Sequence, residues 1–182
     1  NPKRVYGNNK TSPSTRMASA AILREWLFKA KAYHDKKKDG KDVEFNMKLE
    51  SLSRVFDGLP VKIHAHQADD IMTAIRIAKE FNLDMTVEHA TEGYLIADVL
   101  KENNQRVIIG PTLGNKSKYE LKEKSFKSGK VLSDAGVSFA IMTDHPVIEQ
   151  KHTLVQLALF VKEGLDELEA LKAVTINAAK LC

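Results

Sequence analysis

The stretch VKIHAHQADDI, residues 61–71, joins a short strand-like run to the start of a helical pattern. In a strand, residues two apart point to the same face, so His64 and His66 share one side while Ile63 and Ala65 share the other. The apolar residues that follow recur at the spacing of one helix face. The stretch therefore predicts a strand that leads directly into a helix, with two histidines at the point of transition.

Three more strand-like runs follow the first, over 84–89, 106–111 and 137–144. A helical pattern comes after each run, or a long loop that leads to one. Their spacing fits successive βα units, which form a parallel sheet with right-handed crossovers. The four units predict an α/β fold, either a small doubly wound domain or half of an eight-stranded barrel.

Helix ends give further expectations. Asp69 or Asp70 is expected to be the N-cap of the helix after the first strand, and Asp166 has the spacing of a capping box before the last helical pattern. The first 60 residues contain no strand-like run, and helices are expected over 16–38 and 46–57.

Composition narrows the class of protein. The chain has 182 residues, of which 43% are hydrophobic and 29% charged, which is typical of an ordinary globular domain. It has no apolar run long enough to cross a bilayer and no signal-peptide core, so a cytoplasmic protein without a membrane partner is expected. The only cysteine, Cys182, excludes an intrachain disulfide and a cysteine-based metal site.

The charged residues argue against nucleic acid as a partner. The net charge is +4, but only six of the 28 basic residues are arginine, the side chain that phosphate and base-edge recognition favours. Lysines cluster at 36–38 and over 115–130, where glutamates interleave with them in the second cluster. Both clusters are expected to be solvated surface.

Polar residues collect where the predicted strands end. His64 and His66 end the first strand, His89 ends the second and Asp144 the fourth. In a parallel α/β fold, catalytic groups gather at the carboxyl ends of the strands. A lone histidine there is usually a structural hydrogen bonder, but the combination favours a site. His145 is equally compatible with a partner of such a site and with a loop residue.

The chemistry expected of this set is metal-assisted. Imidazole nitrogens with one carboxylate and an open position for water are the ligands that Zn²⁺ prefers in catalytic sites. A carboxylate beside the activated water can take its proton. The expected metal ligands are therefore a histidine of the first strand, His64 or His66, together with His89 and Asp144, whose carboxylate is also the candidate proton acceptor.

At this point the sequence resembles a known family. The order IHAH on one strand, VEHAT on the next and TDHP two strands later, followed by TINAAKL, is similar to the second half of metal-dependent amidohydrolases, and most of all to imidazolonepropionase-related members. The resemblance runs from about residue 58 to the end and extends more loosely to NPKRVYG (1–7) and STRM (14–17). It implies a (β/α)8 TIM barrel, of which this chain holds roughly strands 5 to 8 with their helices, and one or two metal ions at the carboxyl-terminal mouth.

The resemblance also implies roles for single residues. His64 corresponds to the metal ligand on strand 5, His89 to the ligand or substrate-contacting histidine on strand 6, and Asp144 to the ligand and general base on strand 8. His66, Gln67, His145 and Arg16 are the expected substrate-binding residues. Deaminating relatives carry a glutamate where this chain has Gln67, which disfavours deamination.

The implied function is hydrolysis of a carbon–nitrogen bond by metal-activated water, in a small amide, cyclic amide or dipeptide-like substrate. Zinc is the expected ion, with iron and manganese as alternatives. Two other readings stay open. One is a small doubly wound binding domain without catalysis, whose strand order reverses within the chain and in which His64, His89 and Asp144 do not converge. The other is a catalytically dead barrel paralogue.

The resemblance covers only part of a barrel. A typical barrel needs about 250 residues, so residues 1–182 are expected to be its C-terminal half, with a helical segment over 1–60 after the missing strand 4 and four βα units over 61–182. Such a half is expected to be inactive alone, and the metal can be absent from it. Its unpaired strand edges and apolar inner face predict self-association.

Overall fold

The chain forms two compact units in a computed structural model that describes residues 6–9 and 11–181; residues 1–5, 10 and Cys182 lie outside the described part. The first unit runs up to Val61 and includes Arg76–Asp84, and the second comprises Lys62–Ile75 and the chain from Met85 onward. The polypeptide therefore passes from one unit to the other within a strand and again within a helix. No described helix is long and apolar enough to cross a membrane.

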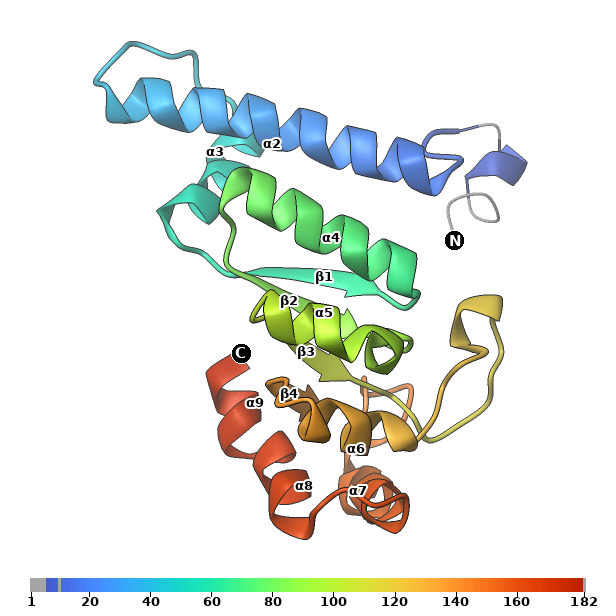
Figure 1. The fold of residues 1–182 in the computed structure, drawn as a ribbon. Coiled ribbons are helices and arrows are strands. Elements are labelled where there is room, and N and C mark those ends of the chain that lie inside the picture. Colours follow the sequence, from blue (N-terminus) through green and yellow to red (C-terminus); the bar gives the residue numbers. More distant parts are fainter. Residues whose placement is uncertain (1–5, 10, 182) are drawn as a thin grey trace. The chain divides into compact units, whose positions relative to one another are not determined.

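The first unit is helical (Figure 1). Its elements are η1 (Gly7–Asn9), α2 (Arg16–Lys38), α3 (Met47–Ser53) and η2 (Arg54–Asp57). Thr15 caps α2, because its side chain accepts a hydrogen bond from the backbone N–H of Ala18 at 3.0 Å. The helix predicted over 16–38 is confirmed, and the one predicted over 46–57 is divided into α3 and η2.

Apolar packing and ion pairs hold the first unit together. Leu27, Ile77 and Phe81 form its buried cluster, and partly buried side chains such as Leu52 and Phe56 pack against them. Arg24 donates two hydrogen bonds to the carboxylate of Glu80, at 2.7 and 2.6 Å. Helix α2 is thereby tied to residues 76–84, which are far from it in sequence.

The second unit contains the βα repeats. Its elements in chain order are β1 (Val61–Ala65), α4 (Ala68–Phe81), β2 (Met85–His89), η3 (Gly93–Ile96), α5 (Ala97–Glu102), β3 (Arg106–Ile109), η4 (Tyr119–Leu121), α6 (Lys127–Asp134), β4 (Phe139–Ile141), η5 (Gln150–His152), α7 (Thr153–Lys162), α8 (Glu167–Val174) and α9 (Ile176–Leu181). β1 begins and α4 ends within the first unit.

The four strands form one parallel sheet in the order β1-β2-β3-β4. In the register, Val87 lies beside Val107, which lies beside Phe139, and His89 lies beside Ile109. All four predicted strands are present, so the α/β fold class is confirmed. The strand order does not reverse within the described sheet, contrary to what the doubly wound alternative predicts.

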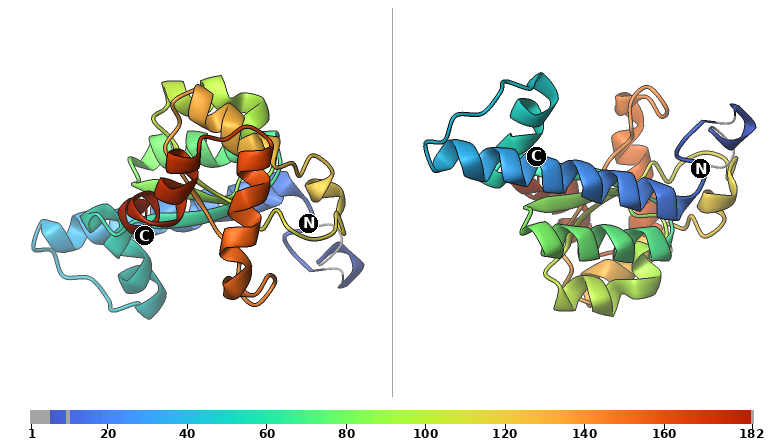
Figure 2. Two further views of the ribbon diagram at one scale, coloured as in Figure 1. Left: turned by 90° about the horizontal axis from the view of Figure 1, so that it is seen from below. Right: turned by 90° about the horizontal axis from the view of Figure 1, so that it is seen from above.

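The last helix, α9, lies on one face of this sheet. Ile108 and Ala140 of the strands form a buried cluster with Leu181 of α9, while α5 and α6 lie on the opposite face (Figure 2). Lys62 donates hydrogen bonds to the carbonyl oxygen of Leu181 at 2.9 Å and to the carboxylate of Glu88 at 3.2 Å. The sequence pattern predicted no separate helix over 176–181.

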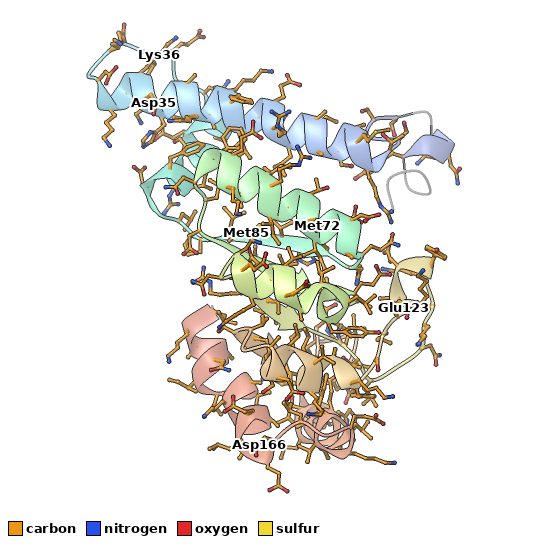
Figure 3. All side chains as sticks on the ribbon, viewed as in Figure 1. Asp35, Lys36, Met72, Met85, Glu123 and Asp166 are labelled. Atoms are coloured by element: carbon orange, nitrogen blue, oxygen red, sulfur yellow. The ribbon has the colours of Figure 1, made fainter. Side chains whose placement is uncertain are left out.

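One predicted helix cap is confirmed and one is wrong. Asp166 lies at the start of α8 (Figure 3), and its Oδ1 accepts from Leu168 N at 2.9 Å and Glu169 N at 3.1 Å. Asp69 and Asp70, by contrast, lie inside the first turn of α4, which begins at Ala68.

Candidate functional site

The candidate site lies at the carboxyl-terminal edge of the sheet in the second unit. His64 is near the end of β1, His66 follows β1, and His89 is the last residue of β2. Because neighbouring parallel strands end at the same edge, residues 64–66 and 89 are brought together although more than twenty positions separate them in sequence. This is the edge at which the sequence predicted the chemistry.

The structure brings His64 and His89 into direct contact. Nε2 of His89 lies 3.0 Å from Nδ1 of His64, and Nδ1 of His89 lies 3.0 Å from the carbonyl oxygen of Gly110. A carbonyl only accepts, so Nδ1 of His89 carries a proton and donates it. In the neutral ring Nε2 is then the acceptor, and Nδ1 of His64 is the donor.

His66 forms the other side of this histidine cluster. Its ring stacks on that of His89, with centroids 4.6 Å apart and planes inclined by 23°. Its Nδ1 lies 2.8 Å from the hydroxyl oxygen of Thr91. Burial, and secondly the proximity of His89, lowers the pKa of His66 to about 4. His66 is therefore a neutral imidazole at physiological pH.

The backbone is strained at two of the predicted site residues. His89 has φ 70°, the following Ala90 has φ 41°, and Asp144 has φ 52°. Residues with a Cβ seldom adopt this left-handed region, which costs roughly 1–2 kcal/mol per residue. Strain of this kind persists where the surrounding structure imposes it, and it is concentrated at functional sites.

A cavity of about 510 Å³ opens at this edge of the sheet. Three predicted site residues, His66, His89 and Asp144, contribute to its lining, and the loop after β3 supplies much of the rest. Apolar side chains such as Leu113 and Ile148 lie among these polar groups. A concave, partly apolar site with a few convergent polar groups is the usual form of a small-molecule pocket.

Part of the second lysine cluster lines this cavity and is not merely solvated surface. Lys118 and Lys124 both contribute to its lining. Nζ of Lys124 donates to the carbonyl oxygens of Gly114 at 2.8 Å and Asn115 at 3.0 Å, and burial lowers the pKa of Lys124. Lys124 therefore folds the loop back on itself, which the alternation of lysine and glutamate did not reveal.

The same loop is also attached to the segment that follows β2. The hydroxyl of Tyr94 donates to the carbonyl oxygen of Glu123 at 3.1 Å, and Figure 3 shows Glu123 in the loop before α6. The loop is thus held by hydrogen bonds within itself, from Lys124, and by a hydrogen bond from Tyr94 outside it. These contacts fix the part of the loop that lines the cavity.

Glu92 is a buried acid that sequence reasoning missed. Its Oε2 accepts a hydrogen bond from the backbone N–H of Ala68 at 3.0 Å, so Glu92 caps α4 from a distant segment. This interaction explains why the predicted caps Asp69 and Asp70 are not needed. Oε1 of Glu92 is buried without a hydrogen-bond partner among the described residues. No local pattern signals such a cap, because it joins the loops after β1 and β2.

The remaining predicted substrate-binding residues do not belong to the described lining of the cavity. Gln67 precedes α4, and its carbonyl oxygen accepts from Ile71 N at 3.0 Å. His145 is exposed and does not belong to the described lining of the cavity. Arg16 is the first residue of α2, in the other unit.

The histidine pair fits two corners of a metal site. With Zn–N bonds of 2.0–2.1 Å and tetrahedral angles, two imidazole nitrogens should lie about 3.3 Å apart, close to the 3.0 Å between His64 and His89. The hydrogen bond from His89 to Gly110 is the kind of second contact that fixes a ligating imidazole. The structure does not bring Asp144 together with this pair, because the described residues contain no group of three histidine, cysteine or acidic side chains that could hold a metal ion.

Comparisons with known proteins agree with this architecture. An amidohydrolase of known structure from Thermotoga maritima MSB8 is 43% identical to this chain and has a TM-score of 0.93; the match covers 100% of this chain and 49% of that protein. The curated amidohydrolase TasK of Hapsidospora irregularis is 23% identical over 199 residues, which cover 98% of this chain and 20% of that protein. No family model matches the chain.

The chain thus spans about half the length of the solved relative and a fifth of the curated one. Both relatives are named amidohydrolase. The two similarities support a relationship between this chain and amidohydrolases.

Proposed function

We propose that this chain contributes half of the active site of a metal-dependent amidohydrolase that cleaves carbon–nitrogen bonds. The observation that carries the proposal is the His64–His89 pair, whose facing nitrogens lie 3.0 Å apart with His89 oriented by Gly110. The similarity to two proteins named amidohydrolase supports it.

In this proposal the four βα units are strands 5 to 8 of a (β/α)8 barrel, related to the imidazolonepropionase branch. Four parallel strands in sequential order, without reversal, are what one side of a barrel requires. The solved relative is about twice as long as the matched segment. The half alone is proposed to be inactive.

His64, His89 and Asp144 would hold the ion, which we take to be zinc, with iron or manganese as alternatives. When bound, such an ion activates water and polarises the carbonyl group of the substrate. His64 must give up its Nδ1 proton, or move it to Nε2, before Nδ1 can act as a ligand. His89 already presents an unprotonated Nε2.

Asp144 is the proposed general base. Its carboxylate would take the proton of the attacking water and deliver it to the leaving nitrogen. Asp144 lines the same cavity as His89, and its φ of 52° lies in the left-handed region. His66 would contribute a neutral imidazole to the substrate side, since its pKa is about 4.

The proposed substrate is a small amide, cyclic amide or dipeptide-like molecule. Gln67 cannot donate a proton as a carboxylic acid does, which favours amide hydrolysis over deamination. His145 and Arg16 remain proposed substrate contacts. The proposed setting is the cytoplasm, without nucleic acid or membrane partners, and with self-association of the chain.

Cobalt binding tests the proposal. Co²⁺ replaces Zn²⁺ in tetrahedral sites and gives visible absorption bands, so the chain should show these bands on titration, and Zn²⁺ should compete. His89→Asn should weaken binding at least about tenfold, because it removes one ligand. His152→Asn, a histidine of η5 outside the cluster, should bind as the unmodified chain does.

Two results would contradict the assignment of His64, His89 and Asp144 as ligands that hold the ion in this chain. One is the absence of stoichiometric Co²⁺ or Zn²⁺ binding by the folded chain. The other is equal loss of binding in the His89 and His152 variants, since binding would then not depend on the histidine cluster.

A further inference from the structure

Gln156 is a fully buried polar side chain that the proposed reaction does not use. It lies on α7 with 0% exposure, between apolar neighbours such as Leu157. A carboxamide buried without hydrogen bonds costs about 1–3 kcal/mol in proteins, so its partners show why the position is polar.

Those partners are backbone groups at the ends of two strands. Oε1 of Gln156 accepts from Thr112 N at 3.0 Å and Leu113 N at 3.2 Å. Its Nε2 donates to the carbonyl oxygen of Met142 at 3.0 Å. One side chain therefore joins the segment after β3 to the segment after β4.

The backbone pairing of β3 with β4 ends near these segments. Met142 N donates to Ile109 O at 2.9 Å, after which Gly110 turns the chain with φ 122°. The Met142 carbonyl is so close that a Cβ on Gly110 would lie 2.3 Å from its oxygen. Gln156 binds the Met142 carbonyl through Nε2, and it binds the backbone N–H groups of Thr112 and Leu113, just after Gly110, through Oε1.

Both strand ends carry parts of the candidate site. The carbonyl oxygen of Gly110 accepts from His89 Nδ1, two residues before Thr112. Asp144 follows Met142 by two residues and has φ 52°. Gln156 does not belong to the described lining of the cavity. Any influence on the site must therefore pass through the backbone that it holds.

We propose that Gln156 is a positioning residue for the histidine cluster. By holding the ends of β3 and β4 together, it keeps the Gly110 carbonyl where His89 can donate to it, and so keeps His89 Nε2 facing His64. Its expected effect on zinc affinity rests on the proposed function, whereas its effect on the histidine pair in the metal-free chain does not.

Imidazole ¹⁵N spectra of the metal-free chain at neutral pH test the proposal directly. Gln156→Met keeps the length of the side chain and removes all three hydrogen bonds. The His89 and His64 signals should shift, and the amide protons of Thr112 and Leu113 should exchange faster than in the unmodified chain, because they lose their acceptor. Leu157→Met is the matched control, since it places the same residue at the next buried position of α7, and it should leave these signals in place.

Zinc titration provides the second readout. Gln156→Met should raise the dissociation constant of Zn²⁺ about tenfold, within the range found for groups that orient metal ligands. Leu157→Met should change it less than twofold. A folded Gln156→Met chain whose histidine signals and zinc affinity both match those of Leu157→Met would overturn the proposal.

Two further measurements apply if Gln156→Met does not fold. Gln156→Glu keeps the shape and the acceptor but loses the donor to Met142, and its histidine signals should also shift. In the unmodified chain, zinc should slow the amide exchange of Thr112 and Leu113, because coupling between two sites is reciprocal. Unchanged signals and unchanged exchange would overturn the proposal. Failure of the unmodified chain to bind zinc would instead refute the proposed function, and the metal-free spectra would still decide the role of Gln156.

Discussion

A methyl group at position 110 would collide with the backbone. Its carbon would lie 2.3 Å from the Met142 carbonyl oxygen, and φ of 122° is itself unfavourable for any residue with a side chain. The carbonyl oxygen of Gly110 also accepts from His89. One glycine thus makes possible both the close approach of two strands and the orientation of a proposed metal ligand.

Gly110→Ala is predicted to destabilise the second unit and to release His89. Gly114→Ala is the matched control, because Gly114 has a similar φ of 116° but only an ordinary 3.5 Å contact with a side-chain carbon of Ile148. The free energy of unfolding, from urea titration followed by circular dichroism, should fall at least about 2 kcal/mol further for Gly110→Ala than for Gly114→Ala. Equal losses of unfolding free energy in the two variants would show that the positive φ, and not the contact with Met142, causes the destabilisation.

His34 gives the first unit a dependence on pH. Its Nε2 lies 2.9 Å from Oδ1 of Asp57, and this hydrogen bond is the main cause that raises the pKa of His34. A raised pKa in the folded state means that the charged pair contributes fully below the unfolded value of about 6.5. That contribution is lost as the pH rises through the folded value.

The stability of the first unit is therefore predicted to fall from pH 6 to pH 9, by less than about 1 kcal/mol because Asp57 is largely exposed. Trp26, the only tryptophan, lies in α2, so its fluorescence reports unfolding of this unit. The measurement is the difference in urea midpoint between the unmodified chain and His34→Gln. A difference that stays constant with pH would contradict the prediction.

Single residues differ in how far the sequence could predict them. His64 and His89 were predicted because strand ends can be located from local patterns, and the structure brings them together. Gln156, Gly110 and Glu92 could not be predicted in the same way. Gln156 and Glu92 each bind a segment that is distant in sequence, and Gly110 allows two backbone segments to come close together. Hydrophobic periodicity does not encode either kind of contact. A glutamine within an apolar helix pattern therefore looks misplaced until its hydrogen-bond partners are known.

At the scale of elements, prediction succeeded where the signal is local. Short apolar runs of strand length located all four strands, and α2 has the bounds that its amphipathic pattern predicted. Prediction failed where tertiary contacts decide whether a helix forms. The short helix α9 has six residues, too few to be stable alone, and it is stabilised by packing on Ile108 and Ala140.

The cap of α8 allows a test at this scale. Asp166 accepts from the backbone N–H groups of Leu168 and Glu169, so Asp166→Ala should lower the free energy of unfolding by about 1 kcal/mol. Asp166→Asn keeps a side-chain oxygen and should recover most of that loss. Chemical denaturation followed by circular dichroism measures both variants. Equal losses in alanine and asparagine would indicate that charge, and not the hydrogen bonds, stabilises the helix start.

For the molecule as a whole, the exposed apolar side chains have a consequence. Neighbouring helices α7 and α8 each present apolar residues that are more than half exposed, namely Leu154, Val155, Leu168 and Leu171. Several exposed apolar side chains on neighbouring helices are a feature of many interaction surfaces. The sheet adds unpaired strands at its two ends, β1 and β4, in the described part of the chain.

Self-association through the α7–α8 surface is accordingly predicted. In sedimentation velocity, the average mass of the unmodified chain should rise with concentration, because burying these side chains removes apolar area from water. Leu168→Lys should shift the concentration dependence at least about tenfold, since it places a charge within the buried area. Gln150→Lys adds the same charge at an exposed polar position outside these four residues and should leave association unchanged. A chain that remains monomeric at its highest soluble concentration would refute self-association, and equal behaviour of the two lysine variants would refute the assignment of the surface.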